Sequence, residues 1–333
     1  MNIKKNCELK RIFFIATLGL LFLASCGGSE KIATEATTTS SSTSLSTTSS
    51  TLAVTTTTQT VIATTTTIDP EDWVGPRHPL TGLPTSEGII PRPALAVKIG
   101  NNDVNSLPHE GLAEADIVYE ALIEAGKTRF LGIYQSSLPD RVAPVRSARS
   151  TDISLIGNLS NPHFAYWGSN EGVGVEVEEA ERSGTFVRQS AETNSSGAFS
   201  RDPSRGNSPY DGVLNPAYLI GDIPALAPTA VFDYGALPIS AVPTFGLRWE
   251  TEGRVVEYLW DQQSLKWQRF QDGSPMNDSN GIQLDSENVL LLYVDYSRSN
   301  ADPNSPQAQS TGTGDGWLLR NGKIVGITWD RQF

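Results

Sequence analysis

Six arginines in two short stretches are the residues of this chain best suited to chemistry. They are Arg129, Arg141, Arg146, Arg149, Arg201 and Arg205. Guanidinium groups offer planar pairs of donors that match carboxylate and phosphate oxygens. Arg146 and Arg149 also directly precede an expected helix, whose free N–H groups favour an anion. We therefore predict an anion-binding site; its ligand-binding residues are Arg129, Arg146, Arg149, Arg201 and Arg205.

The same arginines have a second, purely structural interpretation. The neighbouring acids Glu120, Glu124, Asp152 and Asp202 could pair with them and hold loops in place. The two interpretations are compatible, and the sequence leaves both open.

Glu120 and Glu124 are the candidates for catalysis. They follow each other at even spacing in a segment that alternates between apolar and polar residues, which would place both on one face of a strand, with Arg129 near Glu124 across a turn. A carboxylate pair is the machinery of glycoside hydrolysis, in which one acid protonates and the other attacks or activates water. A cell-wall glycan hydrolase is therefore the alternative to a binding protein.

Other chemistry finds little support. Only His78, His109 and His163 could act as imidazole bases, and the sequence has no nucleophile-elbow motif to pair with them. Metal-ligand spacings and phosphate-binding loops are lacking, so we expect no metal and no cofactor. Five tryptophans could form a sugar-stacking platform, although aromatic residues at strand spacing usually belong to a core. They are Trp249, Trp260, Trp267, Trp317 and Trp329.

The first residues look like an export signal. Four basic residues precede an apolar run of 13 residues, 12–24, which is shorter than the roughly 20 that a membrane-spanning helix needs. The run ends in Leu23-Ala24-Ser25-Cys26, which resembles a lipobox. We expect residues 1–25 to be a signal peptide and Cys26 to be acylated, which would anchor the protein to the outer face of the cell membrane.

A polar stalk follows the expected anchor. From Thr34 to Ile68, 24 of 35 residues are Ser or Thr, without helical or strand periodicity. Such a tract buries too little apolar area to offset its conformational entropy, so residues 26–68 are expected to be disordered. Residues 69–333 carry 20 basic and 34 acidic groups, and this acidic balance argues against nucleic acid as a partner.

The remaining chain predicts an α+β fold. Residues 117–124 and 130–134 form an expected hairpin, and 163–167 an expected strand. Short helices are predicted after Ser150 as N-cap and over 175–182. We expect a mixed α/β domain over 69–225 and a smaller β-rich domain over 226–333, with hairpin turns at Asp272-Gly273 and Asn321-Gly322. The chain ends at Phe333 directly after an expected strand, which favours a shortened second domain over a natural end.

Several motifs in this region resemble the YerB-like lipoprotein family, whose ectodomain has no known function. They run in the family's order and begin at residue 78. The main ones are His78-Pro79-Leu80-Thr81-Gly82-Leu83-Pro84, Ala115-Asp116-Ile117-Val118-Tyr119-Glu120, Thr128-Arg129-Phe130 and Pro144-Val145-Arg146-Ser147-Ala148-Arg149. The chain departs from the family at His78, where an Asn is usual, and at Tyr210-Asp211, where a His-Asn pair is usual. The resemblance implies the fold and a lipid-anchored location in the envelope. For the predicted anion site, a cell-wall polymer or an envelope protein is the natural candidate partner.

Overall fold

The computed structural model describes residues 73–221 and 224–332. The predicted signal peptide, Cys26 and stalk lie outside these residues. Contacts gather residues 65–333 into one compact unit. Among the described residues, no helix is long and apolar enough to cross a membrane.

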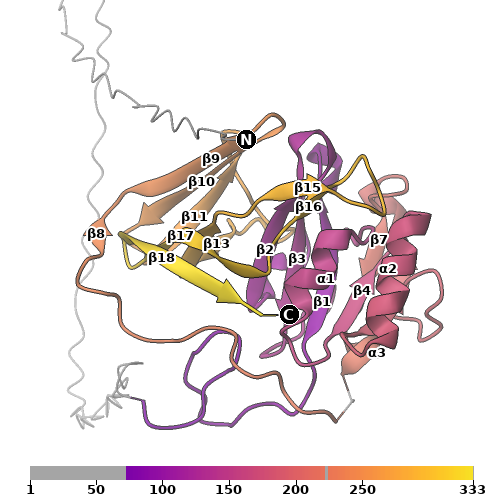
Figure 1. The fold of residues 1–333 in the computed structure, drawn as a ribbon, viewed down its shortest axis with the longest axis horizontal. Helices are drawn as coiled ribbons and strands as arrows, with labels where there is room; N and C mark the ends of the chain where they lie inside the picture. The colour runs from indigo at the N-terminus through magenta and orange to yellow at the C-terminus, as the bar shows by residue number, and fades with distance from the viewer. Residues whose placement is uncertain (1–72, 222–223, 333) are drawn as a thin grey trace, which may run out of the picture. The chain divides into compact units, whose positions relative to one another are not determined.

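A five-stranded mixed sheet forms the centre of the N-terminal half (Figure 1). Its order is β2-β3-β1-β4-β5; β2, β3 and β1 pair antiparallel, and β4 and β5 join in parallel. The strands are β1 (Leu95–Asn101), β2 (Ile117–Leu122), β3 (Thr128–Tyr134), β4 (His163–Tyr166) and β5 (Val187–Ser190). The predicted hairpin and the strand at 163–167 are thereby confirmed.

Three short helices and a small hairpin complete this half. The helices are α1 (Ser150–Ile156), α2 (Glu171–Arg182) and α3 (Ala217–Ile220), and the hairpin joins β6 (Phe199–Arg201) to β7 (Gly212–Leu214). α1 begins one residue earlier than predicted, with Arg149 rather than Ser150 as N-cap, and α2 begins at Glu171 because the Asn170 side chain accepts from Val173 N–H.

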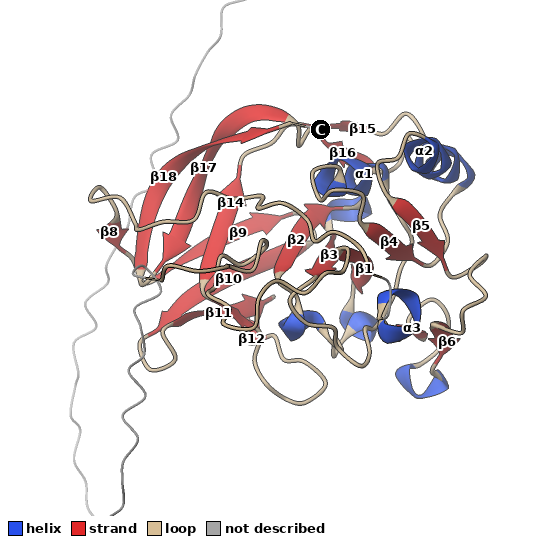
Figure 2. Ribbon diagram, turned by 90° about the horizontal axis from the view of Figure 1, so that it is seen from below, coloured by secondary structure: helices blue, strands red, loops and turns tan. Residues whose placement is uncertain are grey.

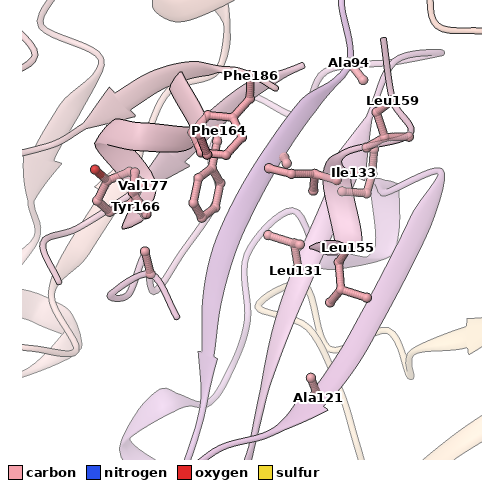
Figure 3. Close-up of a cluster of buried hydrophobic side chains, with 14 of the residues drawn as sticks. Ala94, Ala121, Leu131, Ile133, Leu155, Leu159, Phe164, Tyr166, Val177 and Phe186 are labelled. Carbon is pink, nitrogen blue, oxygen red and sulfur yellow. The ribbon is translucent and has the colours of Figure 1, made fainter. Parts of the chain in front are cut away.

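Apolar side chains pack on both faces of this sheet. One cluster fills the space between the sheet and helices α1 and α2, where Leu131 and Ile133 meet Leu155, Leu159 and other side chains (Figure 3). The other face packs residues such as Leu95, Val97 and Phe130 against α3 and against Met276 and Leu284 from the C-terminal half. The sheet therefore gives the residues around it a rigid support.

The C-terminal half consists of strands (Figure 2). One sheet contains β9 (Gly246–Thr251), β10 (Arg254–Asp261), β11 (Lys266–Gln271), β12 (Ser274–Pro275) and β13 (Asp285–Ser286). A second contains β8 (Val242–Pro243), β14 (Asn288–Leu292), β17 (Gly312–Arg320) and β18 (Lys323–Arg331). A separate hairpin pairs β15 (Tyr296–Arg298) with β16 (Pro306–Ala308).

The predicted turns and the β-rich texture of this half are confirmed. Asn321 and Gly322 have φ of 50° and 68° between β17 and β18, and Asp272 and Gly273 have φ of 51° and 81° between β11 and β12, as expected of the hairpin turns that such pairs favour. The described chain as a whole is mostly β, so the α+β prediction gave helices too large a share. The predicted domain boundary at residues 225 and 226 stays a prediction.

Candidate functional site

Four cationic side chains gather where β1 and β3 meet the start of α1. We call Lys98, Arg129, Arg146 and Arg149 the basic cluster. β1 pairs with β3 so that Lys98 lies opposite Leu131 and Gly100 opposite Arg129. Cross-strand partners share a face, and Leu131 belongs to the core beneath α1 and α2. Lys98 and Arg129 therefore lie on the helix-covered face.

The segment that leads into α1 brings Arg146 to the same place. Arg146 N–H donates to the Lys98 carbonyl, and Gly100 N–H donates to the Pro144 carbonyl, both at 2.9 Å. A Cβ on Gly100 would lie 2.8 Å from Cγ of Arg146, so the glycine in β1 leaves room for the arginine stem.

Arg129 is buried without a carboxylate partner among the described residues. One terminal nitrogen donates to the Ser147 carbonyl at 3.1 Å, and its buried Nε has no acceptor. Burial, followed by the charges of Arg149 and Arg146, lowers the pKa of Arg129. The guanidinium stays charged because its ordinary pKa lies far above neutrality. The protein thus holds this cation in a buried site without an ion pair, and the carboxylates of Glu124 and Asp152 attract it only from beyond ion-pair distance.

Arg146 is in the same situation. It donates to Oδ1 of Asn102 at 2.9 Å, and its guanidinium lies 5.1 Å from the centre of the Tyr210 ring. Its Nε is buried without an acceptor, and the described residues offer no carboxylate within ion-pair distance. Burial lowers the pKa of Arg146 as well.

The other two members of the basic cluster have counter-ions. Lys98 pairs with Asp152 at 2.5 Å, with both side chains almost fully buried, and Arg149 pairs with Glu124 at 2.9 Å. Oδ2 of Asp152 also accepts from Arg149 N–H at 2.8 Å. The Asp152 carboxylate therefore lies at the start of α1 and binds the N–H of its N-cap residue. That the remaining N–H groups of the helix favour an anionic ligand stays a prediction. The cluster contains four cations and two carboxylates, and the excess lies on Arg129 and Arg146.

The remaining arginines are paired elsewhere. Arg141 binds Glu110 and Asp202, Arg205 binds Glu110, and Arg201 binds Asp211 while lying 4.4 Å from the centre of the Trp167 ring. These three arginines therefore fit the structural interpretation, whereas anion binding by the other predicted arginines stays a prediction. Tyr210 and Asp211, where the chain departs from the family that it resembles, contact Arg146 and Arg201 respectively.

Both candidate catalytic glutamates are tied to arginines. Glu120 pairs with Arg269 of β11 at 3.0 Å and accepts from Thr128 and Asn101, and Glu124 binds Arg149 and Ser305. Glu124 also lies beyond the end of β2, so the predicted common strand face does not form, and Arg129 pairs in register with Ala121.

The protonation of Glu124 also argues against acid catalysis. Burial raises the pKa of Glu124, but the hydrogen bond from Ser305 and the charge of Arg149 outweigh it, and the net pKa lies below the ordinary value. A general acid needs a raised pKa.

Two of the candidate histidines, His109 and His163, are buried. His109 is fully buried, and its Nε2 lies 2.6 Å from the Gly100 carbonyl, which only accepts hydrogen bonds, so Nε2 carries the proton. Burial lowers the pKa of His109 to about 4. The His163 Nδ1 lies 3.2 Å from the Gln189 amide. No group of three metal-binding side chains occurs among the described residues.

Two residues of the site, Lys98 and Asn102, were not among the predicted site residues. Lys98 interrupts the apolar run of β1, and because a lysine there is costly to bury without a partner, its position could have indicated a buried ion pair. Nothing in the sequence indicated a role for Asn102, because an asparagine directly after a strand is common in turns.

Comparisons with known proteins agree with the resemblance seen in the sequence. Residues 80–226 match the N-terminal domain, and residues 245–333 the C-terminal domain, of a protein of unknown function, DUF3048. The chain is 28% identical over 264 residues to "Putative lipoprotein YerB" of Bacillus subtilis (strain 168). The aligned region covers 75% of this chain and 77% of that protein.

The fold agrees as well. The crystal structure of YerB from Bacillus subtilis superposes with a TM-score of 0.66 at 24% identity, covering 78% of this chain and 88% of that one. With both halves of the family matched in order, this chain belongs to the YerB-like family of proteins that carry the two DUF3048 domains.

Proposed function

We propose that this protein is an extracytoplasmic lipoprotein that binds an anionic ligand of the cell envelope at the basic cluster. Arg129 and Arg146 bind the anion, and Arg149 assists when its bond to Glu124 loosens. Arg201 and Arg205, whose charges are balanced by Asp211 and Glu110, stay outside the binding group.

The observation that carries this proposal is the pair of buried guanidiniums, Arg129 and Arg146, that form no ion pair among the described residues. An uncompensated buried charge is costly, and a chain rich in acids could readily have supplied a partner. Both Arg129 and Arg146 also have a buried Nε–H without an acceptor, and an orphaned donor of this kind calls for an explanation. A bound phosphate or carboxylate would satisfy charge and donors together.

The location rests on the sequence and on the name of the similar protein. The basic and apolar leader and the Leu-Ala-Ser-Cys sequence at residues 23–26 favour cleavage and acylation of Cys26. The relative's printed name is that of a lipoprotein. On this proposal the membrane is contacted through the lipid, and a cell-wall polymer or an envelope protein supplies the anion.

Ligand-dependent thermal stabilisation of the full-length chain in detergent tests the proposal. The probes are inorganic phosphate, a poly(glycerol phosphate) fragment and a muropeptide with free carboxylates. A ligand at 100 times its Kd adds about 2.7 kcal/mol to the free energy of unfolding, which is readily measured as a rise in Tm. At least one probe is expected to stabilise the protein.

The matched variants are Arg146→Ala and Arg248→Ala. Arg248 lies on β9, is half exposed and pairs with Glu250, so its loss removes the same charge away from the cluster. Arg146→Ala is expected to abolish the stabilisation and Arg248→Ala to preserve it. A shift that both variants retain, or no shift with any probe, would overturn the proposal.

A further inference from the structure

The C-terminal half has an open hollow on the sheet formed by β14, β17 and β18, away from the basic cluster. It measures about 480 Å³. The register of the strands places its main side chains on one face: Trp317 lies opposite Gly326, Asp315 lies opposite Thr328, and Tyr293 N–H donates to the Asp315 carbonyl at 3.0 Å. Figure 2 shows these strands side by side.

The structure separates the tryptophans of this half into core and surface. Trp267 is fully buried, with the Trp260 ring tilted by 54° against it at a centroid distance of 4.9 Å, and Trp329 packs where a Cβ on Gly314 would lie. Trp317 is different, because 38% of its surface is exposed at the edge of the hollow, where Tyr293 is 59% exposed.

Trp317 and Tyr293 form one platform. The indole Nε1 of Trp317 donates to the Tyr293 hydroxyl at 3.2 Å. Since an indole N–H lies in the plane of its ring, the tyrosine oxygen meets the tryptophan at its edge. The ring lies over Gly326, where a Cβ would be 3.7 Å from Cζ3 of Trp317, and the exposed 38% of the side chain is left for a ligand. Gly316 and Gly326 line the hollow without side chains. A rim of hydrogen-bonding groups surrounds the rings: among the described residues, the Asp315 carboxylate and the Thr328 hydroxyl have no side-chain partner.

We propose that this hollow is a binding subsite for a neutral sugar, with Trp317 stacking on the ring and Asp315 and Thr328 binding its hydroxyl groups. A pyranose combines an apolar C–H face with a polar rim, which complements an aromatic surface bordered by acceptors. No lysine or arginine lines the hollow, so an anion has no partner there. A cation would be held better by converging ring faces than by rings that meet at an edge.

This subsite is distinct from the proposed anion site in position and in chemistry. The hollow shares no residue with the basic cluster. One protein would then contact an envelope glycan at two places, through a neutral ring and through an anionic group. Each contact is tested separately.

Ligand-observed saturation-transfer NMR and calorimetry on the full-length chain provide the test, in a detergent without a sugar headgroup. The probes are chitotetraose, cellotetraose and maltotetraose, with choline as the cationic comparison. At least one tetrasaccharide is expected to bind with a millimolar or lower Kd. Trp317→Ala should weaken that binding at least tenfold, and Trp317→Phe, which keeps an aromatic face, should weaken it less.

Tyr218→Ala is the matched control, since Tyr218 is an exposed aromatic residue on α3. It should leave sugar binding unchanged. If Trp317→Ala does not fold, as judged by circular dichroism, Asp315→Ala reports instead through loss of hydrogen bonds to the sugar, because alanine has no group that can replace the carboxylate. Absence of binding by all three tetrasaccharides, binding that survives both variants, or binding of choline alone would overturn the proposal. Anion stabilisation through Arg146 would be unaffected by any of these results.

Discussion

At the scale of single residues, one of the two carboxylates of the basic cluster competes with an anion for Arg149. Glu124 is the acid that pairs with Arg149, and Ser305 holds it there. Glu124→Gln would remove the competing charge and keep the hydrogen bond from Ser305. We expect affinity for the best anionic probe to rise about three- to tenfold, the effect of roughly 1 kcal/mol from a partly exposed ion pair.

Calorimetric titration of wild type and variant measures this change. Glu178→Gln is the charge-matched control, because Glu178 of α2 pairs with Arg188 of β5 and not with the basic cluster. Equal gains in anion affinity for both variants would show that the change in net charge, and not the loss of the Glu124–Arg149 ion pair, causes the effect.

His109 makes the stability of the fold depend on pH. Its pKa is about 4 in the folded chain and 6.5 in its ordinary state. The unfolded chain therefore binds more protons between these values, so stability is fully present above pH 6.5 and falls as the pH drops towards 4. The shift corresponds to about 3 kcal/mol.

Denaturant unfolding at pH 7 and pH 4 measures this dependence. Wild type is expected to lose about 3 kcal/mol more than His109→Gln over that range. If the two proteins lose stability equally, another group causes the pH dependence.

At the scale of elements, the β17–β18 hairpin depends on its turn. Gly322 has φ of 68°, and a Cβ there would lie 2.9 Å from Nε1 of Trp260. Gly322→Ala therefore combines backbone strain with a steric contact. We expect it to reduce the free energy of unfolding by about 2 kcal/mol.

Gly184→Ala isolates the backbone contribution. Gly184 has φ of 80°, and nothing lies within 4 Å of a Cβ there. It should cost about 1 kcal/mol, less than Gly322→Ala when both are measured by thermal unfolding. Equal losses of stability in the two variants would show that the Trp260 side chain moves away from the new Cβ at no cost in free energy.

At the scale of the whole described unit, a buried polar network joins the two halves. The side-chain amides of Asn101 and Gln271 exchange hydrogen bonds at 2.9 and 3.0 Å, and Arg254 donates to the Asn101 carbonyl. Glu120 and Arg269 form an ion pair beside them. The network fixes the end of β1, next to Asn102, which binds Arg146.

Gln271→Ala would remove both hydrogen bonds that the Gln271 amide makes with the buried Asn101 amide. We expect a loss of about 1 to 3 kcal/mol in a single unfolding transition that both halves share. Gln262→Ala, at an exposed position, should change little. Two separate transitions in the wild type would show that the halves unfold independently.

The sequence by itself determined the local elements and the family. Alternation predicted the β2–β3 hairpin, and Asn321-Gly322 and Asp272-Gly273 predicted turns, because their causes lie within a few residues. The motifs from residue 78 onward identified the family for the same reason: residue types in a fixed order need no coordinates.

Only the tertiary structure decided which charges are balanced. The sequence placed six arginines and many acids near one another, and nothing local distinguished Arg146, which lacks an ion pair among the described residues, from Arg141, which has two. The same holds for the tryptophans, of which Trp267 is buried and Trp317 exposed. Ion pairs and burial depend on residues far apart in the chain, such as Glu120 with Arg269, and only packing brings these together.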